Sequence, residues 1–256
     1  MELKKTNIGF FMAVPDLISL LNLSFGFLAI LMAINNQIYI SAIFIIIALI
    51  FDSLDGWIAR KLSRIDNYGF GKNIDSLSDI VSFGVAPGIL LYCSGRYIGT
   101  IGLLGQFHYL DYLLAFVALF VVICGVLRLT RFNVIADNLD FKGFIGIPIP
   151  TAGIVLSSFI LTGFFNIYFA MILMMVVGIL MISNIKYSKL NNPKLLLICA
   201  ILVILAIIPY KIIYLNINIP ATIIFIITLI YILYGLLGRL IRSEERRVGK
   251  ECRSRW

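Results

Sequence analysis

The sequence predicts an all-α fold, a polytopic transmembrane helix bundle of about eight spans with both chain termini in the cytoplasm. Three observations support this prediction. Of the 256 residues, 61% are hydrophobic and only 13% are charged, with a mean hydropathy of +1.03, which is not the composition of a soluble domain. The apolar residues form runs of roughly 20, the length that crosses a hydrocarbon core. Lysine and arginine gather in alternate connections between these runs.

The apolar runs define the predicted spans in order. Their approximate bounds are 17–34, 39–60, 75–94, 109–130, 147–164, 168–185, 194–210 and 219–238. Residues 1–14 contain two lysines among apolar residues and are predicted to form an interfacial amphipathic helix. We expect residues 15–187 to form a catalytic core of six transmembrane helices. Residues 188–241 are expected to add two further spans. The Arg/Glu-rich tail, 242–256, is either a solvated basic extension or sequence foreign to the protein.

The basic residues predict the orientation in the membrane. With the N-terminus in the cytoplasm, every lysine and arginine except Arg96 and Lys211 falls on the cytoplasmic side. This asymmetry explains the net charge of +8 without a nucleic-acid partner. We therefore expect a multi-pass protein of the cell membrane, surrounded by membrane lipids. The four cysteines have neither CxxC nor zinc-like spacing, so we expect no disulfide framework and no structural zinc.

Four aspartates lie where the second predicted span ends and the third begins. Asp52 and Asp55 are spaced i, i+3, and Asp75 and Asp79 are spaced i, i+4. On helices, each spacing places its pair on one face, a turn apart. If the two helices meet there, four carboxylates converge, and without a cation they would repel one another. Oxygen ligands in this pattern suit Mg²⁺, Mn²⁺ or Ca²⁺ rather than zinc.

This segment resembles the signature of the CDP-alcohol phosphotransferase family, D-x2-D-G-x2-A-R-x8-G-x3-D-x3-D. The matching positions are Asp52, Asp55, Gly56, Ala59, Arg60, Gly71, Asp75 and Asp79. Ten residues separate Arg60 from Gly71, which is longer than the x8 of the signature. We interpret the difference as a two-residue insertion in the connector 61–70, which leaves both pairs of aspartates intact.

The resemblance implies a role for each matched position. In such an enzyme, Asp52, Asp55, Asp75 and Asp79 hold two Mg²⁺ or Mn²⁺ ions, and Asp79 is the candidate general base. The implied binding residues for a CDP-linked lipid are Asn22, Asp52, Gly56, Ala59, Arg60 and Gly71. The acceptor alcohol attacks the β-phosphorus of that lipid and CMP leaves. The resemblance also implies a homodimer.

Three further elements resemble the serine-using branch of the family, the phosphatidylserine and archaetidylserine synthases. They are Ser82 to Pro87 (Ser-Phe-Gly-Val-Ala-Pro), Leu127 to Asn133 (Leu-Arg-Leu-Thr-Arg-Phe-Asn) and Gly146 to Pro150 (Gly-Ile-Pro-Ile-Pro). This resemblance implies L-serine as acceptor and CDP-diacylglycerol or CDP-archaeol as donor. The candidate serine-binding residues are Ser82, Arg128, Arg131 and Asn133, because guanidinium binds carboxylate bidentately.

Other interpretations of these residues stay open. Arg128 and Arg131 could snorkel to the cytoplasmic interface, and Ser19 with Asn22 forms either interhelical hydrogen bonds or a ligand-facing stripe. A sister enzyme would use glycerol 3-phosphate or inositol phosphate as acceptor. A cation transporter with intramembrane acids is a less favoured alternative, because Gly56 and its neighbours have no role in ion transport. The prediction is a metal-dependent transferase with its active site toward the cytoplasm.

Overall fold

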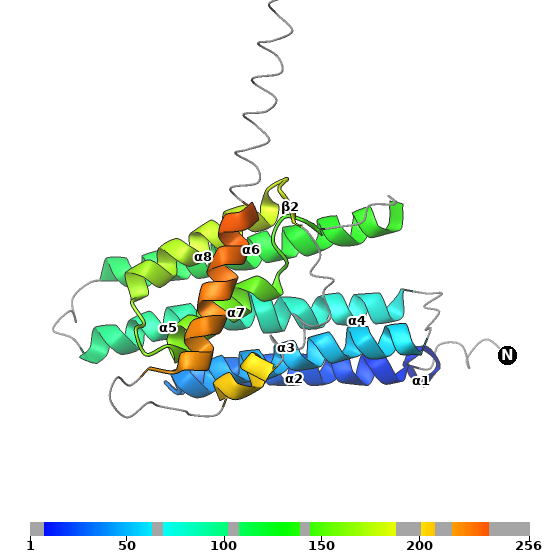
Figure 1. Ribbon diagram of the computed structural model, residues 1–256, viewed down its shortest axis with the longest axis horizontal. Coiled ribbons are helices and arrows are strands. Elements are labelled where there is room, and N and C mark those ends of the chain that lie inside the picture. The colour runs from blue at the N-terminus through cyan, green and yellow to red at the C-terminus, as the bar shows by residue number, and fades with distance from the viewer. Residues whose placement is uncertain are drawn as a thin grey trace, which may run out of the picture.

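The computed structural model describes residues 8–62, 69–101, 108–138, 144–187, 201–207 and 217–235. Within these ranges the chain is built almost entirely of apolar helices, which confirms the predicted all-α membrane fold. Most helices run along the long axis of the molecule, and the helix Ile219–Gly235, drawn in orange, crosses them steeply (Figure 1).

The labelled elements follow one another along the chain. The helices are α1 (Ile8–Phe11), α2 (Val14–Ile34), α3 (Ile38–Lys61), α4 (Phe70–Asp79), the π-helical segment η2 (Ile80–Val85), α5 (Ala86–Ile101), α6 (His108–Asn138), α7 (Pro150–Leu161) and α8 (Ile167–Ile182). Two short strands, β1 (Phe144–Ile145) and β2 (Lys186–Tyr187), pair antiparallel. They join the connection before α7 to the one after α8.

Four of the described helices are long and apolar enough to cross a membrane. They are Val14–Ile34, Ile38–Lys61, Phe70–Tyr97 and Tyr109–Ile135, and the shorter apolar helices are Pro150–Leu161, Ile167–Ile182 and Ile219–Gly235. These seven correspond in order to seven of the predicted runs, and only 201–207 of the run 194–210 is described. The total of eight spans stays a prediction. The interfacial helix 1–14 is described only from Ile8 onward, and the tail 242–256 lies outside the described residues.

The third span begins at Phe70, earlier than the predicted residue 75. The prediction began too late because the first turns of this helix are polar and do not belong to an apolar run. It also contains a wide turn directly after Asp79, where the Ala86 N–H donates to the Val81 carbonyl, five residues back. Pro87 follows, and in a regular α-helix its ring would collide with the carbonyl of Phe83. The wider turn accommodates the proline, and such π-helical insertions often accompany functional sites.

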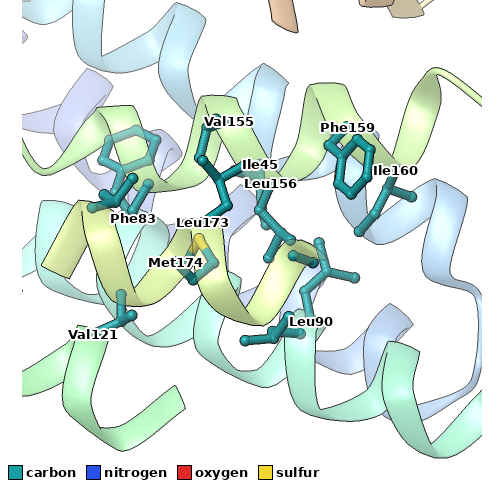
Figure 2. Close-up of a cluster of buried hydrophobic side chains, with 14 of the residues drawn as sticks. Ile45, Phe83, Leu90, Val121, Val155, Leu156, Phe159, Ile160, Leu173 and Met174 are labelled. Atoms are coloured by element: carbon teal, nitrogen blue, oxygen red, sulfur yellow. The ribbon is translucent and has the colours of Figure 1, made fainter. Parts of the chain in front are cut away.

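The core lies among α3, η2, α7 and α8, beside the aspartate-bearing ends of the helices. Ile45, Phe83, Leu156 and Met174 come from these four elements and are at most 1% exposed, and they gather in one cluster (Figure 2). An added Cβ on Gly153 would lie 3.0 Å from both Ile45 and Phe83, so α7 packs without a gap. Because lipid is as apolar as these side chains, close packing rather than removal from water holds them together.

Large apolar side chains also cover the outer faces of the helices. Leu31 on α2, Phe116 and Leu119 on α6, and Ile172 on α8 are all exposed. In water such a surface would drive aggregation, whereas in a bilayer it faces lipid tails. The described helices therefore belong to a protein embedded in a membrane.

Candidate active site

Three of the four predicted aspartates converge between α3 and α4. Asp52, Asp55 and Asp75 each offer one carboxylate oxygen, and these oxygens all lie within 4.8 Å of one another. Asp55 is buried, at 5% exposed, while Asp52 and Asp75 are half-buried. The cluster is therefore closed on the Asp55 side and reachable from the other. We refer to these three residues as the aspartate cluster.

Asp79 lies one turn further along α4, beside the aspartate cluster. Its carboxyl group lies close to that of Asp52, and it accepts a hydrogen bond of 3.3 Å from Asn22 Nδ2. Ser82 Oγ donates to the backbone carbonyl of Asn22 at 3.0 Å. An added Cβ on Gly26 would lie 2.7 Å from Ser82 Cα, so α2 and η2 are in direct contact. The structure thus brings Asn22 to Asp79 and places Ser82 in a helix–helix contact.

A polar stripe on α2 completes the closed side of the cluster. Ser19 Oγ donates to Asp55 Oδ2 at 2.6 Å, and Asp16 lies near enough to Asp55 for their charges to interact. Asp16, Ser19 and Asn22 are spaced three residues apart and are all buried. Ser19 and Asn22 therefore form interhelical hydrogen bonds, which was one of the two interpretations of their spacing. Sequence analysis had not connected Ser19 with the aspartates.

The residues present fit a hard divalent cation. Each residue of the aspartate cluster contributes one carboxylate oxygen to a group in which all three lie within 4.8 Å of one another. Carboxylates this close are stable only when protons or a cation neutralise them. A set of oxygen ligands with one open side is what Mg²⁺, Mn²⁺ and Ca²⁺ prefer in proteins. The identity and number of the ions, and the role of Asp79 as a ligand, stay predictions.

The remaining predicted donor-binding residues lie on both helices that form the cluster. They are Gly56, the half-buried Ala59, the exposed Arg60 and the buried Gly71. An added Cβ on Gly56 would lie 3.5 Å from Arg60 Nη1, so the arginine side chain folds back over the glycine. Gly69 begins α4 with a left-handed φ of +67°. Gly69 therefore serves the turn, while Gly71 lies one helical turn before Asp75 on the same face.

Arg128 on α6 is a buried cation whose charge reaches Asp79. It is 4% exposed, and its guanidinium interacts electrostatically with the Asp79 carboxyl group. The guanidinium carbon also lies 5.1 Å from the centre of the Phe132 ring, a cation–π contact. A guanidinium this deeply buried does not snorkel to the interface. Buried charges within transmembrane helices are costly, and they normally mark a functional site.

Arg131, one turn along the same helix, contacts the backbone instead. Its guanidinium donates hydrogen bonds of 2.9–3.1 Å to the carbonyls of Ile145, Met181, Ile182 and Ser183. The last carbonyls of a helix lack intrahelical partners, so Arg131 caps α8 and ties it to α6 and β1. Gly146, with a φ of +77°, allows this approach, since an added Cβ would lie 2.7 Å from Arg131 Nη2. Serine binding by Arg131 stays a prediction.

Asn133 lies near the end of α6 and links it to α4. Its Nδ2 donates to Ser76 Oγ at 2.8 Å, and Lys72 Nζ donates to its backbone carbonyl at 3.0 Å. Ser76 is adjacent to Asp75 in the sequence, so this link holds the end of α6 against the aspartate-bearing helix α4. Sequence analysis missed Ser76 and Lys72, and their only signal is a position on the same helix as the aspartates.

The family model for CDP-alcohol phosphatidyltransferases matches residues 12–183, a range that contains all the site residues described above. The chain belongs to this family. The aspartate cluster and Asp79, which α3 and α4 bring together, lie within the matched range.

Among curated proteins, the chain is similar to relatives from archaea and bacteria. It is 47% identical to the archaetidylserine synthase of Methanothermobacter thermautotrophicus over 182 residues, covering 71% of this chain and 72% of the relative. It is 37% identical to the CDP-diacylglycerol–serine O-phosphatidyltransferase of Methanocaldococcus jannaschii over 232 residues, 90% of this chain and 96% of the relative. The protein of the same name from Bacillus subtilis is 34% identical over 174 residues, 68% and 89% of the two chains.

Proposed function

We propose that this protein transfers a phosphatidyl or archaetidyl group from a CDP-linked lipid to the hydroxyl of L-serine and releases CMP. The observation that supports this most directly is the buried Arg128, whose charge interacts with that of Asp79. With a divalent cation bound, the cluster suits the diphosphate of the donor, and a buried guanidinium suits an acceptor that bears a carboxylate. The similar archaeal and bacterial proteins named for serine support the same acceptor.

On the donor side, we propose that Asp52, Asp55, Asp75 and Asp79 hold two Mg²⁺ or Mn²⁺ ions. When bound, such ions neutralise a diphosphate and stabilise the departing phosphate. The protein itself contributes a face of small residues along α3 and the exposed Arg60, which forms charge-assisted hydrogen bonds to phosphate. We place Gly56, Ala59 and Gly71 against the nucleotide and Asn22 beside it.

On the acceptor side, Asp79 is the proposed general base. The hydrogen bond from Asn22 holds its carboxyl group in place, so that it can take the proton from the serine hydroxyl. The serine oxygen then forms a bond to the β-phosphorus, and the bond from that phosphorus to the CMP oxygen breaks. Arg128 holds the serine carboxylate during this step. Of the other predicted serine ligands, Ser82, Arg131 and Asn133 bond to neighbouring helices, and we propose that they act by keeping Arg128 and Asp79 in register.

We further propose that the enzyme lies in the cell membrane with its site toward the cytoplasm. Basic residues flank the site, and the exposed Lys61 lies 4.8 Å from the centre of the exposed Trp57 ring. Such Trp and Lys pairs are typical of a membrane–water interface. A homodimer is proposed on the family resemblance alone.

A reconstitution assay tests the proposed function. Purified protein in lipid vesicles is given CDP-diacylglycerol or CDP-archaeol with labelled serine, glycerol 3-phosphate or inositol phosphate, with Mg²⁺, with Mn²⁺ or with EDTA. We expect metal-dependent CMP release and label transfer with serine, and their loss in Asp79→Asn. Transfer to a phosphorylated acceptor in preference to serine, or equal activity in EDTA, would overturn the proposal.

A further inference from the structure

Two residues of α4 bind the same residue of α6. Lys72 Nζ donates to the backbone carbonyl of Asn133 at 3.0 Å, and Asn133 Nδ2 donates to Ser76 Oγ at 2.8 Å. Lys72 and Ser76 are spaced i, i+4, so they lie one turn apart on the same side of α4. All three side chains are half-buried. We refer to Lys72, Ser76 and Asn133 as the α4–α6 strap.

The strap lies where the packing of the third span changes. α4 packs against α2, whereas η2, which continues the span after Asp79, packs against α6. At the level of Asp75, the connection of α4 to α6 therefore includes these polar contacts, ahead of the apolar packing that η2 supplies. The contact from Lys72 carries a charge on its donor, which makes such a hydrogen bond stronger than a neutral one.

Arg131 holds the opposite face of α6. Arg131 and Asn133 are two positions apart, which is about 200° around a helix. The strap and the hydrogen bonds from Arg131 to the end of α8 therefore reach α6 from opposite sides. Arg128, the proposed ligand of the serine carboxylate, lies one turn before Arg131. The part of α6 that carries Arg128 thus ends in a segment that is fixed on two sides.

We propose that Ser76 and Lys72 are positioning residues that align the acceptor on α6 with the donor on α4. The proposal rests on the proposed function, because it assigns the donor to the aspartate cluster and the acceptor to Arg128. Loosening the strap moves the two helices apart without removing a contact to either substrate. Reacting atoms must lie about 3–3.5 Å apart, and a displacement of about 1 Å can cost a hundredfold in rate. The strap therefore acts on kcat rather than on the KM of either substrate.

The test compares Ser76→Ala with Ser53→Ala in the full-length protein. Ser53 follows Asp52 as Ser76 follows Asp75, but Ser53 Oγ donates to the Leu49 carbonyl of its own helix on an exposed face. We expect Ser76→Ala to lower kcat with serine about tenfold, part of the cost of a 1 Å displacement. The KM values of serine and of the CDP-lipid should stay within about twofold of wild type. Ser53→Ala should match wild type.

Two further measurements separate alignment from damage to the donor side or to the fold. The Mn²⁺-dependent rise in melting temperature should persist in Ser76→Ala, because the aspartate cluster is intact. Ser76→Thr keeps a hydroxyl that can accept from Asn133, and it should restore kcat to within about threefold of wild type. Loss of the Mn²⁺ effect would make Ser76 a support for the metal ligands instead and would overturn the proposal.

Lys72→Met removes the other hydrogen bond of the strap and keeps an unbranched apolar side chain. It should lower kcat about as much as Ser76→Ala, and it tests the strap even if Ser76→Ala does not fold. The double variant should lose about thirtyfold rather than a hundredfold, because both bonds act through Asn133.

An unchanged kcat in Ser76→Ala and Lys72→Met would overturn the proposal. The same conclusion would follow from a rise in the serine KM at constant kcat, from a double variant whose loss is the full product, or from an equal fall in Ser53→Ala. If wild type uses another acceptor, the proposed function fails, and the same comparison with that acceptor still tests the strap.

Discussion

The aspartates of α3 and α4 and the arginines of α6 present the same pattern with different outcomes. In both cases, residues of like charge are three or four positions apart on a helix. The aspartates converge, with three carboxylates within 4.8 Å of one another. The arginines separate, since Arg128 is buried and interacts electrostatically with Asp79, while Arg131 binds the carbonyls at the end of α8.

The difference lies in what each charge can find as a partner. A carboxylate accepts hydrogen bonds but donates none when ionised, and a helix interior offers it few donors, so the aspartates share a cation or protons. A guanidinium carries five donors, and helix ends offer it unsatisfied carbonyls. An arginine pair can therefore divide between a ligand and a scaffold, whereas an aspartate cluster has few alternatives to a metal.

The largest effect should come from breaking the aspartate cluster. We expect Asp55→Asn to lower CMP release roughly a hundredfold or more, because it removes the buried ligand on the closed side. It should also abolish the Mn²⁺-dependent rise in melting temperature, since a cation stabilises only the state that binds it. Asp111→Asn, in the first turn of α6, is the matched control and should behave as wild type. A Mn²⁺ shift that persists in Asp55→Asn would contradict the assignment.

Replacement by lysine should affect the serine KM at Arg128 and the melting temperature at Arg131. Arg128→Lys should raise the serine KM about thirtyfold, as expected when a bidentate, charge-assisted contact is lost, with little change in melting temperature. Arg131→Lys should lower the melting temperature by about 5 °C or more, because one ammonium cannot replace hydrogen bonds to four carbonyls. Its serine KM should stay within about threefold of wild type.

Steady-state kinetics with serine and a thermal unfolding curve for both variants decide between the two roles. Each arginine is the control for the other, because the charge is kept and the helix is the same. If Arg131→Lys instead raises the serine KM without loss of stability, Arg131 is a serine ligand after all, and the two arginines act together.

The sequence was sufficient for the fold class and for the convergence of the aspartates, and the reasons are physical. Apolar runs of membrane length have few alternatives to helices, and i, i+3 or i, i+4 spacing then fixes which residues share a face. Spacing does not say what lies opposite that face. The carbonyls around Arg131 come from residues fifty positions away or from β1, and no local pattern identifies them.

Two further features were outside the reach of sequence patterns. The third span begins in the polar stretch after Gly69, because its charged residues face the site rather than lipid, and a hydropathy window cannot distinguish these cases. The C-terminal helix looked like plain apolar sequence. The contact of Tyr231 with Tyr187 of β2 depends on tertiary packing.

The smallest effect should come from removing the Ser19 hydroxyl, which donates a hydrogen bond to Asp55 of the aspartate cluster. Ser19→Ala removes the 2.6 Å hydrogen bond to Asp55 Oδ2, and partners that orient a metal ligand typically contribute about tenfold or more to metal affinity. We expect the Mn²⁺ concentration for half-maximal CMP release to rise about tenfold, with the rate at saturating Mn²⁺ within about threefold. Ser24→Ala is the control, since Ser24 Oγ bonds only to the Leu20 carbonyl of its own helix on an exposed face. Equal Mn²⁺ dependence in the two variants would mean that packing alone holds Asp55 in place. The hydrogen bond from Ser19 would then not contribute to metal binding by the aspartate cluster.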